Sequence, residues 1–428
     1  MKVIVLGAGV IGVTTAYFLA KAGHQVTVLE KNPASSMGCS YANGGQLSYS
    51  HIEPWASKSS IISFAKAAFC PSSFLSISDF FANFFDRDFF KWSMEFCKNA
   101  KQKKNQENSK KLFALSGHSK TALEEIMREE TGLKFNYNNT GILHFFKNQK
   151  KFDAAIKEAE VHNAFGCKAQ ILNKDECVKK EPTLVKLYDE NKLLGGIFYE
   201  MDASGDSLLF TKALEKICRE KYGVIFEYNT DVRNIFNNRK KITGINTNRG
   251  VFVANKYVYA LGAYGNKLLS GIGINPKIYP LKGYSLSLEA NREFIAPNLA
   301  LTDSENKVVY SRIGDVFRVA GTIEICSAKN NNNQKNIEFL KDITKSSFSD
   351  FGNFNNVKTW FGFRPFRPNS IPLICEAKKY ENFLINAGHG SLGWTLAAGS
   401  AKIAADLVAD KKSKKFEFLE EEEKGIYI

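Results

Sequence analysis

The first thirty residues combine short apolar runs with one helical pattern. Residues 2–6 read KVIVL, a β-branched run typical of a buried parallel strand. A helix is expected over residues 13–22, because Gly23 follows it in the usual C-cap position. Residues 24–30, HQVTVLE, predict a second strand. The chain is therefore expected to open with a βαβ unit.

The rest of the chain changes periodicity from block to block. Helical spacing predicts helices over residues 109–130, 151–165, 207–222 and 394–410. Strand-like runs occupy residues 140–146, 195–199, 224–228, 242–247, 250–254, 257–260, 284–290, 308–320, 357–363 and 383–387. Segments of α/β type at both ends thus flank a more antiparallel middle. This order predicts an α/β fold in which one domain interrupts the other.

Residues 57–99 are unusually rich in Phe, in amphipathic helical segments broken near Pro71. Two interpretations stay open for this stretch. The rings of Ile61–Phe96 either pack the core of a domain or, beside Lys91 and Lys98, dock on an anionic membrane surface.

The composition is that of an ordinary globular protein, with 44% hydrophobic and 24% charged residues among 428. These values exclude wholesale disorder and a small disulfide scaffold. No apolar run reaches the roughly 20 residues that a transmembrane helix needs. Residues 1–20 are apolar enough for a signal peptide, but their glycine spacing favours a folded strand-to-helix turn.

The net charge is +14, from 58 Lys and Arg against 44 Asp and Glu. A basic excess can indicate nucleic acid, anionic membranes or acidic ligands as partners. The lysines are spread along the whole chain without an Arg-rich stripe, so no nucleic acid is expected. The eight Cys form no CxxC pair and the six His are dispersed, which predicts no metal site and a reducing, cytoplasmic compartment.

Gly7, Gly9 and Gly12 form a G-x-G-x-x-G pattern between the first strand and the first helix. Glycines there let the backbone turn tightly and approach a pyrophosphate at the helix N-terminus, where free N–H groups favour anions. Glu30 ends the second strand, where a carboxylate can accept hydrogen bonds from ribose hydroxyls and would repel a 2′-phosphate. Because strand, helix, second strand and acid all fall where required, the pattern predicts a dinucleotide site.

Residues 386–395, NAGHGSLGWT, form a Gly-rich turn from a strand into a helix. Such a turn can present backbone N–H groups to an electron-rich ring edge. A reduced flavin carries negative charge at N1 and the adjacent carbonyl, which a helix N-terminus stabilises. The turn therefore favours FAD over NAD, with a simple helix cap as the alternative.

Arg364 stands in the segment Gly362–Pro365, with Pro368 and Pro372 beyond it. A rigid loop that holds one Arg suits bidentate capture of a carboxylate, because the guanidinium fork matches carboxylate geometry. We therefore expect Arg364 to bind an acidic group of the substrate. An ordinary surface Arg is the alternative.

Together these motifs resemble the FAD-dependent D-amino-acid oxidase superfamily, and more closely the small subunits of bacterial D-amino-acid dehydrogenases. Besides the first thirty residues, the resemblance is carried by Tyr41–Ser48, Pro54–Trp55, Glu200–Asp206, Tyr279–Ser285, Phe361–Pro365 and Gly388–Thr395. It implies a Rossmann-type FAD-binding domain (residues 1–50, 204–275 and 362–428) interleaved with an antiparallel-sheet substrate domain (residues 51–203 and 276–361).

The resemblance also implies roles for individual residues. The expected FAD contacts are Gly7, Gly9, Val10, Ile11, Gly12, Glu30, Lys31, Asn43, Gly44, Gly45, Gln46, Val232, Gly262, Gly388, Gly390, Ser391, Leu392, Gly393, Trp394 and Thr395. Arg364 would bind the substrate carboxylate, and Tyr310 and Tyr284 are the other candidate catalytic residues. Whether Tyr310 or Arg312 faces the substrate stays open. Relatives of the sarcosine-oxidase type tie their flavin to a Cys; none occurs in Phe361–Pro365 or Gly388–Thr395, so noncovalent FAD is expected.

The implied reaction is oxidative deamination of D-amino acids, such as D-alanine, to 2-oxo acids and ammonia. The implied electron acceptor is a quinone, which adds the surface of the inner membrane to the expected partners of a cytoplasmic protein. An oxygen-using oxidase of glycine, sarcosine or D-hydroxyproline shares nearly all these motifs and stays as the alternative. Two other classes are a tRNA-modifying flavoprotein and a binding-only flavoprotein. Dispersed charge disfavours the first, and an intact Arg364 disfavours the second.

Overall fold

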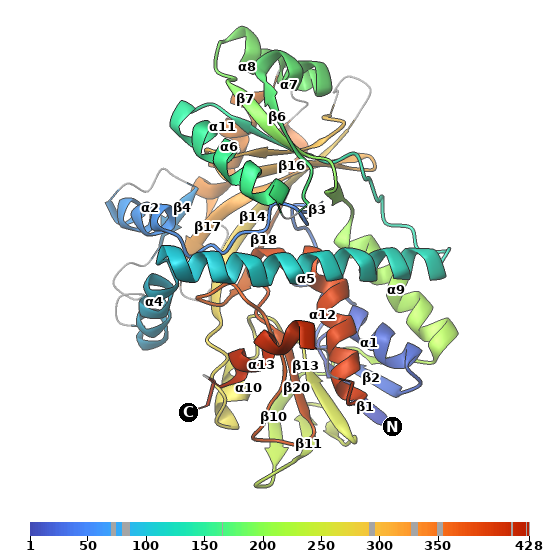
Figure 1. Ribbon diagram of the computed structural model, residues 1–428. Coiled ribbons are helices and arrows are strands. Elements are labelled where there is room, and N and C mark those ends of the chain that lie inside the picture. The colour runs from blue at the N-terminus through green and yellow to red at the C-terminus, as the bar shows by residue number, and fades with distance from the viewer. Residues whose placement is uncertain are drawn as a thin grey trace.

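The computed structural model of the protein confirms the expected α/β class, with two large sheets and helices packed on both (Figure 1). The structure describes residues 1–69, 74–78, 86–164, 166–290, 296–326, 333–348, 354–411, 414–424 and 426–427. Within these ranges, no helix is both long and apolar enough to cross a lipid bilayer.

A six-stranded sheet occupies the lower half of Figure 1, in the order β19-β20-β13-β1-β2-β9. Its strands are β1 (Lys2–Leu6), β2 (Gln25–Leu29), β9 (Ile225–Glu227), β13 (Lys256–Tyr259), β19 (Leu373–Glu376) and β20 (Phe383–Ala387). Neighbouring strands are parallel except β19 and β20. The central β1 is buried from Val3 to Leu6, which explains its continuous apolar run.

Helices α1 (Val10–Lys21), α9 (Ser207–Tyr222) and α12 (Gly393–Val408) pack beside this sheet. The long helix α5 (Gln102–Glu129) lies across the middle of the molecule and packs on α12 (Figure 1). Gly399 permits this approach, because a Cβ there would lie 2.7 Å from the Ser119 Cα. Although α5 falls in the range expected for the substrate domain, its Leu112 and Leu123 share a core with Val13 of α1.

A nine-stranded sheet forms the upper half, in the order β18-β14-β17-β16-β15-β5-β7-β6, with β4 also paired to β17. Its strands are β4 (Leu75–Ile77), β5 (Ile142–Phe146), β6 (Ala169–Asn173), β7 (Gly195–Tyr199), β14 (Tyr279–Glu289), β15 (Ala300–Asp303), β16 (Val308–Ile313), β17 (Val316–Ile325) and β18 (Lys358–Phe366). All pairs are antiparallel except β15 with β5 and β17 with β4.

Smaller elements complete the structure. The remaining strands are β10 (Val232–Asn237), β11 (Ile242–Thr247) and β12 (Gly250–Phe252) in one sheet, and β3 (Gln46–Leu47) with β8 (Ala203–Ser204) in another. The remaining helices are α2 (Lys58–Phe69), α4 (Arg87–Asn99), α6 (Gln149–Ala164), α7 (Lys174–Lys180), α8 (Val185–Asp189), α10 (Asn266–Gly271), α11 (Gln334–Ser347) and α13 (Glu417–Glu423). Single 3-10 turns are η1 (Pro182–Leu184), η2 (Phe354–Asn356), η3 (Gly390–Leu392) and η4 (Lys414–Phe416).

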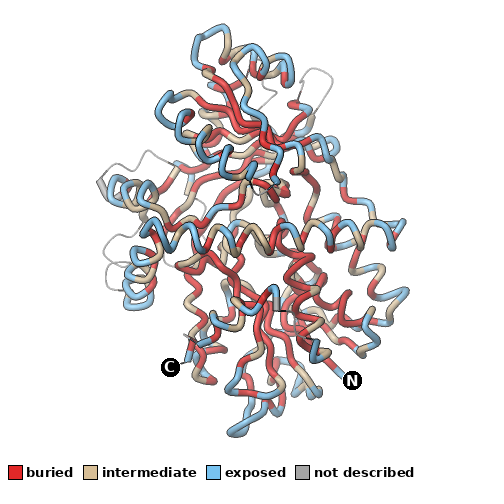
Figure 2. Tube along the Cα trace, in the orientation of Figure 1, coloured by how far each residue is buried: buried red, intermediate tan, exposed pale blue. Residues whose placement is uncertain are grey.

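Figure 2 shows buried residues concentrated in the two sheets and in α12, while the outer helices alternate buried and exposed positions. Two local expectations need correction. Helix α1 begins at Val10, directly after Gly9, rather than at residue 13. Arg364 lies within β18 rather than in a loop. The strand tolerates Pro365 because β18 is at the edge of its sheet, where a missing N–H breaks no ladder on the outer side.

The described part of the Phe-rich stretch is largely an aromatic cluster. Trp92 and Phe96 of α4 are buried, and Trp55 packs on Phe64 with ring centroids 5.0 Å apart. Phe90 and Met94 of α4 remain 59% and 47% exposed. Phe80, Phe81, Phe84 and Phe85 lie outside the described residues. The core interpretation thus holds for the inner face of α4, and the outer face still presents apolar side chains.

Candidate cofactor and active site

A cavity of about 1180 Å³ runs between the two large sheets, from the loop after β1 to α2 and α6. It is lined by every residue expected to contact FAD except Gly12 and Gly388. Arg364 and Tyr284 also line it, whereas Tyr310 and Arg312 do not. The sequence motifs, which are hundreds of residues apart, therefore meet around one space.

The glycine turn after β1 has one open side. Gly7 has a φ of +99°, and a Cβ on Gly12 would lie 1.9 Å from the Gly7 oxygen, so Gly12 serves helix–strand packing. A Cβ on Gly9 would meet only the Ser40 hydroxyl, at an ordinary 3.5 Å. Protein packing does not require Gly9 to lack a side chain, and the space beside it belongs to the cavity. This is the position where a pyrophosphate must approach the backbone.

Glu30 ends β2 at the cavity wall and is held by the turns around it. Its Oε2 accepts a hydrogen bond from the Ala8 N–H at 2.8 Å, and its Oε1 accepts one from the Asn32 N–H at 3.0 Å. Oε1 also accepts from Asn32 Nδ2 at 2.6 Å, so it is Oε2 that keeps lone-pair capacity for a further donor. Lys31 places its ammonium 4.5 Å from the ring centre of Tyr264, so both residues border the same end of the cavity.

The turn Asn43–Gln46 packs tightly against the upper sheet. A Cβ on Gly44 would lie 2.5 Å from Val309 Cγ2, and Gly45 has a φ of +74°. The half-buried Arg318 donates from Nη1 to the Asn43 oxygen at 2.9 Å, which holds the turn against the upper sheet. The turn therefore presents backbone, and little side-chain bulk, to the cavity.

The Gly-rich turn before α12 forms the opposite wall. Gly388 has a φ of +87°, and a Cβ there would meet Arg367 Cδ at 2.7 Å, so its role is in packing. Thr395 Oγ1 accepts from the Ser48 N–H at 3.2 Å, which ties this turn to the segment after Gln46. Trp394 is 6% exposed, and its Nε1 has no hydrogen-bond partner among the described residues. A buried N–H that lines a cavity favours a ligand with an acceptor.

These features fit FAD. A tight glycine turn at the start of α1, a carboxylate at the end of β2 and a helix N-terminus at the other end of the cavity are what an extended dinucleotide needs. Glycines that let the backbone come close to a ligand, together with the Trp394 N–H that lacks a partner among the described residues, also suit the edge of a flavin ring.

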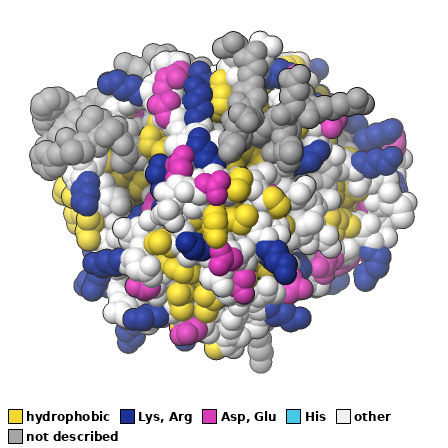
Figure 3. All heavy atoms as spheres, turned by 90° about the horizontal axis from the view of Figure 1, so that it is seen from above, with side chains coloured by type: hydrophobic (Ala, Val, Ile, Leu, Met, Phe, Trp, Pro, Cys, Tyr) yellow, Lys and Arg dark blue, Asp and Glu magenta, His cyan; other side chains and the backbone are white. Residues whose placement is uncertain are grey.

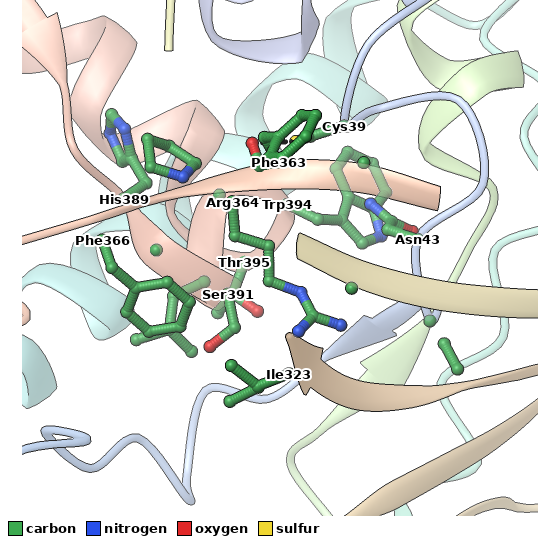
Figure 4. Close-up of a pocket in the computed structure, with 18 of the residues that line it drawn as sticks. Cys39, Asn43, Ile323, Phe363, Arg364, Phe366, His389, Ser391, Trp394 and Thr395 are labelled. Carbon is green, nitrogen blue, oxygen red and sulfur yellow. Dashed lines mark hydrogen bonds between the residues drawn. The ribbon is translucent and has the colours of Figure 1, made fainter. Parts of the chain in front are cut away.

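Arg364 reaches from β18 into the cavity, with its guanidinium directed toward the strand that carries Ile323 (Figure 4). Nη1 donates to the Thr322 oxygen at 2.8 Å and Nη2 to the Gly321 oxygen at 3.3 Å. Among the described residues no carboxylate pairs with it. Burial lowers its pKa, and the nearby Cys39 thiol opposes this shift. Gly283 makes room for the head group, since a Cβ there would lie 2.2 Å from Arg364 Cζ. A desolvated cation in this setting is a ready site for a substrate carboxylate.

The two candidate tyrosines occupy different places. Tyr284 is among the residues that line the cavity, but it belongs to the same buried cluster as Tyr310, and its hydroxyl donates to Glu324. Burial and this hydrogen bond raise the pKa of Tyr284. Tyr310 is fully buried among Phe317 and Phe348 on the other face of β16, because neighbouring residues of a strand point to opposite faces. The geometry therefore does not support Tyr310 as a substrate contact, and Val309 takes the cavity position instead.

Arg312, the alternative to Tyr310, is exposed and bonds only weakly to the Gly314 oxygen at 3.5 Å. It therefore lies outside the cavity, and Arg364 is the Arg positioned for a substrate carboxylate.

One group of cavity residues had no signal in the sequence. His51, His144 and Tyr199 come from a loop, from β5 and from β7, and their rings meet at one end of the cavity. Their sequence separations carry no recognisable spacing. Only the pairing of β5 with β7, and the passage of residues 48–51 over that pair, bring them together.

A profile described as FAD dependent oxidoreductase, for the DAO family, matches residues 2–407. The D-amino acid dehydrogenase of Paramagnetospirillum magneticum is 35% identical over 417 residues, 96% of each chain. The D-amino acid dehydrogenase of Azorhizobium caulinodans is 34% identical over 412 residues, covering 96% of this chain and 97% of its own.

Solved structures give the same fold. Glycine oxidase from Bacillus cereus superposes with a TM-score of 0.74 at 20% identity, over 100% of this chain and 98% of its own. L-proline dehydrogenase from P. horikoshii has a TM-score of 0.72 at 18% identity, over 98% of both chains. Because the profile and the relatives span nearly the whole chain, the protein belongs to the DAO family of FAD dependent oxidoreductases.

Proposed function

We propose that the protein catalyses the oxidative deamination of D-amino acids to 2-oxo acids and ammonia and passes the electrons to a quinone-type acceptor. The observation that carries the proposal is Arg364, a half-buried guanidinium that faces the cavity without an anionic partner among the described residues. The relatives named D-amino acid dehydrogenase support the substrate class.

In this proposal the protein mainly positions the substrate and removes water from around it. Arg364 binds the substrate carboxylate through the donors that the Thr322 and Gly321 carbonyls leave free. Once the carboxylate is fixed, the face of Cα that meets the Asn43–Gln46 turn decides which enantiomer reacts. Noncovalent FAD, held by the residues named above except Gly12 and Gly388, supplies hydride acceptance. Positioning within a site of low dielectric contributes most of the rate.

The Tyr284 hydroxyl is not free to bind the substrate. The hydroxyl is already engaged with Glu324, which in turn lies 3.7 Å from the Lys282 ammonium. The ring packs 6.2 Å from that of Phe361, and both line the cavity beside Arg364. Tyr284 and Phe361 therefore pack β14 against β18 next to Arg364. No side-chain general base is required if the substrate amine binds in its neutral form.

We also propose that the protein works in the cytoplasm at the surface of the inner membrane. Phe90 and Met94 are exposed on α4 beside Lys91, and Ile62 of α2 is 56% exposed. Aromatic and basic residues on one face favour an interfacial position on anionic lipid. On the face seen in Figure 3, Lys and Arg are interspersed with Asp and Glu, so charge alone does not mark a docking side.

The decisive experiment is turnover on a panel of D-amino acids, glycine and sarcosine, with an artificial dye or oxygen as acceptor. Dye reduction with D-alanine and little hydrogen peroxide is the expected result. Stoichiometric hydrogen peroxide with glycine, sarcosine or D-hydroxyproline would establish the oxidase alternative. No bleaching of the flavin by any D-amino acid would refute the proposed substrate class.

A further inference from the structure

The cavity extends beyond Arg364 to a group of His and aromatic rings to which the proposed reaction above assigns no role. We call this region the histidine chamber and define it by five lining residues: His51, Phe146, His144, Glu158 and Tyr199. Three of the six histidines in the chain gather here, because His162 lies directly behind His51 with ring centres 5.9 Å apart. The histidines are not part of a metal-binding group among the described residues.

Flat rings form the walls of the histidine chamber. His51 stacks on Tyr199 with ring centres 5.5 Å apart and planes 6° from parallel. His144 meets His51 edge-on at 4.6 Å and Tyr199 at 5.1 Å. His144 is 6% exposed and Tyr199 2%, so these walls are dry. The three rings contact one another, so a planar ring would stack on the side of this group that faces the cavity.

The same walls carry unused hydrogen-bonding nitrogens. His51 Nδ1 and His144 Nε2 are buried without a partner among the described residues. Burial lowers the pKa of His51 to about 4 and that of His144 well below its usual value, so both imidazoles are neutral near pH 7. A neutral imidazole can donate to a carbonyl oxygen or accept from a hydroxyl. Buried polar atoms normally find a partner, so these two call for a neutral ligand with oxygen atoms.

The histidine chamber lies near the expected flavin position. Ser48 contacts Thr395 at the start of α12, and His51 follows Ser48 by three residues. Three extended residues span at most about 11 Å. The cavity reaches the surface between α2 and α6, where the lining residues Ser59, Ala154 and Glu158 are exposed. The exposed Ile62 stands on the same helix as Ser59.

We propose that the histidine chamber is the binding site for the ring of a quinone acceptor, with His51 and His144 as hydrogen-bond partners of its carbonyl oxygens. The inference rests on the proposed function, which requires an acceptor. Oxidation of an amino acid to its imino acid releases two electrons and two protons. Reduction of a quinone to a quinol takes up two electrons and two protons, one at each carbonyl oxygen, so the overall reaction balances.

Glu158 and Glu53 offer a path for protons between the histidine chamber and solvent. Partial burial toward the cavity and the neighbouring Glu53 carboxylate raise the pKa of Glu158, while part of its side chain reaches solvent. Glu53 also lies 3.8 Å from His162 Nε2, behind His51. Groups that exchange protons near neutral pH are suited to replace those taken up by the quinone.

Three variants test the site: His51→Phe, His144→Phe and, as the matched control, His118→Phe. Phe keeps the ring and removes the nitrogens. His118 is a half-buried histidine that packs on Phe416 outside the cavity. His51→Asn restores a donor close to the Nδ1 position. The first measurement is equilibrium binding of a short-chain ubiquinone analogue that cannot be reduced, to the oxidised FAD-loaded enzyme.

We expect His51→Phe and His144→Phe to weaken analogue binding by roughly five- to thirtyfold, as for loss of one buried hydrogen bond. His118→Phe should bind like the unsubstituted protein, and His51→Asn should recover part of the loss. In anaerobic rapid mixing, two rates of His51→Phe and His144→Phe are each compared with those of the unsubstituted protein. The factor by which reoxidation of the reduced enzyme by ubiquinone-1 slows should be at least ten times the factor by which reduction of the enzyme by D-alanine slows.

Two outcomes would overturn the proposal. If reduction by D-alanine slows while quinone binding is unchanged, the histidine chamber holds the amino-acid side chain. If neither changes, it holds no ligand of the reaction. Analogue binding does not depend on the amino-acid substrate, so a protein that no D-amino acid reduces would refute the proposed function and still report on the histidine chamber.

Discussion

Replacing Arg364 with Lys tests the carboxylate site directly. Arg364 donates two hydrogen bonds to the Thr322 and Gly321 oxygens at 2.8 and 3.3 Å, and its remaining donors face the cavity. Lys preserves the charge but has one ammonium on a flexible stem, so it cannot satisfy both carbonyls and hold a carboxylate in a bidentate pair. The carbonyls of β17 would then compete with the substrate carboxylate for the Lys ammonium.

Breaking a buried, hydrogen-bonded charge pair costs about 2–5 kcal/mol. At about 1.4 kcal/mol per factor of ten, kcat/KM for D-alanine should fall by roughly 30-fold to several thousandfold. The FAD content should stay normal, because no residue expected to hold FAD is changed. The assay is anaerobic reduction of the flavin by D-alanine in rapid mixing, with FAD content measured from its absorbance.

Arg312→Lys is the matched control, since Arg312 is exposed on β16 and lies outside the cavity. Its kcat/KM should stay within about twofold, as is usual for a surface substitution. Unchanged kinetics for Arg364→Lys, together with normal FAD content, would show that another group binds the carboxylate and would refute the reasoning.

Four further outcomes are expected. Gly9→Leu should abolish FAD binding, because the Leu side chain fills the open side of the turn. The control Gly117→Ala should retain FAD, because a Cβ at residue 117 has nothing within 4 Å in the described part of the chain. A yellow Gly9→Leu protein would contradict this expectation. Tyr284→Phe should lower kcat less than tenfold, since its hydroxyl is engaged with Glu324 rather than with the substrate site, and a thousandfold loss would instead make the hydroxyl catalytic. Burial raises the pKa of Asp202 to about 7, so the folded state binds its proton more tightly than the unfolded state does, and the unfolding free energy should fall as pH rises from about 4 to 7. Urea titrations should show that the unfolding free energy depends less on pH in Asp202→Asn. The same pH dependence in both proteins would exclude Asp202 as its cause. Phe90→Ser with Met94→Ser should reduce sedimentation with anionic liposomes at low salt, and equal sedimentation would place the membrane contact elsewhere.

The sequence determined the cofactor half of the protein almost completely. Lys2–Leu6, Gly7–Gly12 and Glu30 form a local unit, so their spacing alone fixes the strand, turn, helix and acid that the structure shows. The same holds for Asn386–Thr395, where Gly388 and Gly390 have the positive φ values and close contacts that the turn requires. Local steric rules decide such motifs, and they can be read without tertiary structure.

Tertiary structure decided which residues face the cavity on the upper sheet. Tyr310 and Val309 are neighbours in sequence, but the register of β16 with β15 and β17 sends Tyr310 into the core and Val309 to the cavity. A shift of one residue would exchange them, and nothing in the local sequence fixes that register. Arg364 moved from an expected loop into β18 for a related reason, since an edge strand accepts the proline that follows it.

The histidine chamber shows most clearly which contacts sequence patterns cannot predict. His51, His144 and Tyr199 are separated by long stretches of chain, and each by itself is an ordinary residue of a loop or a strand. Their rings meet because β5 pairs with β7 and because Asp202 holds the backbone of Tyr49 and Ser50 at 2.9 and 2.7 Å, directly before His51. Contacts between distant segments follow from strand pairing and packing across the whole fold, whereas sequence patterns report only what neighbouring residues impose on one another.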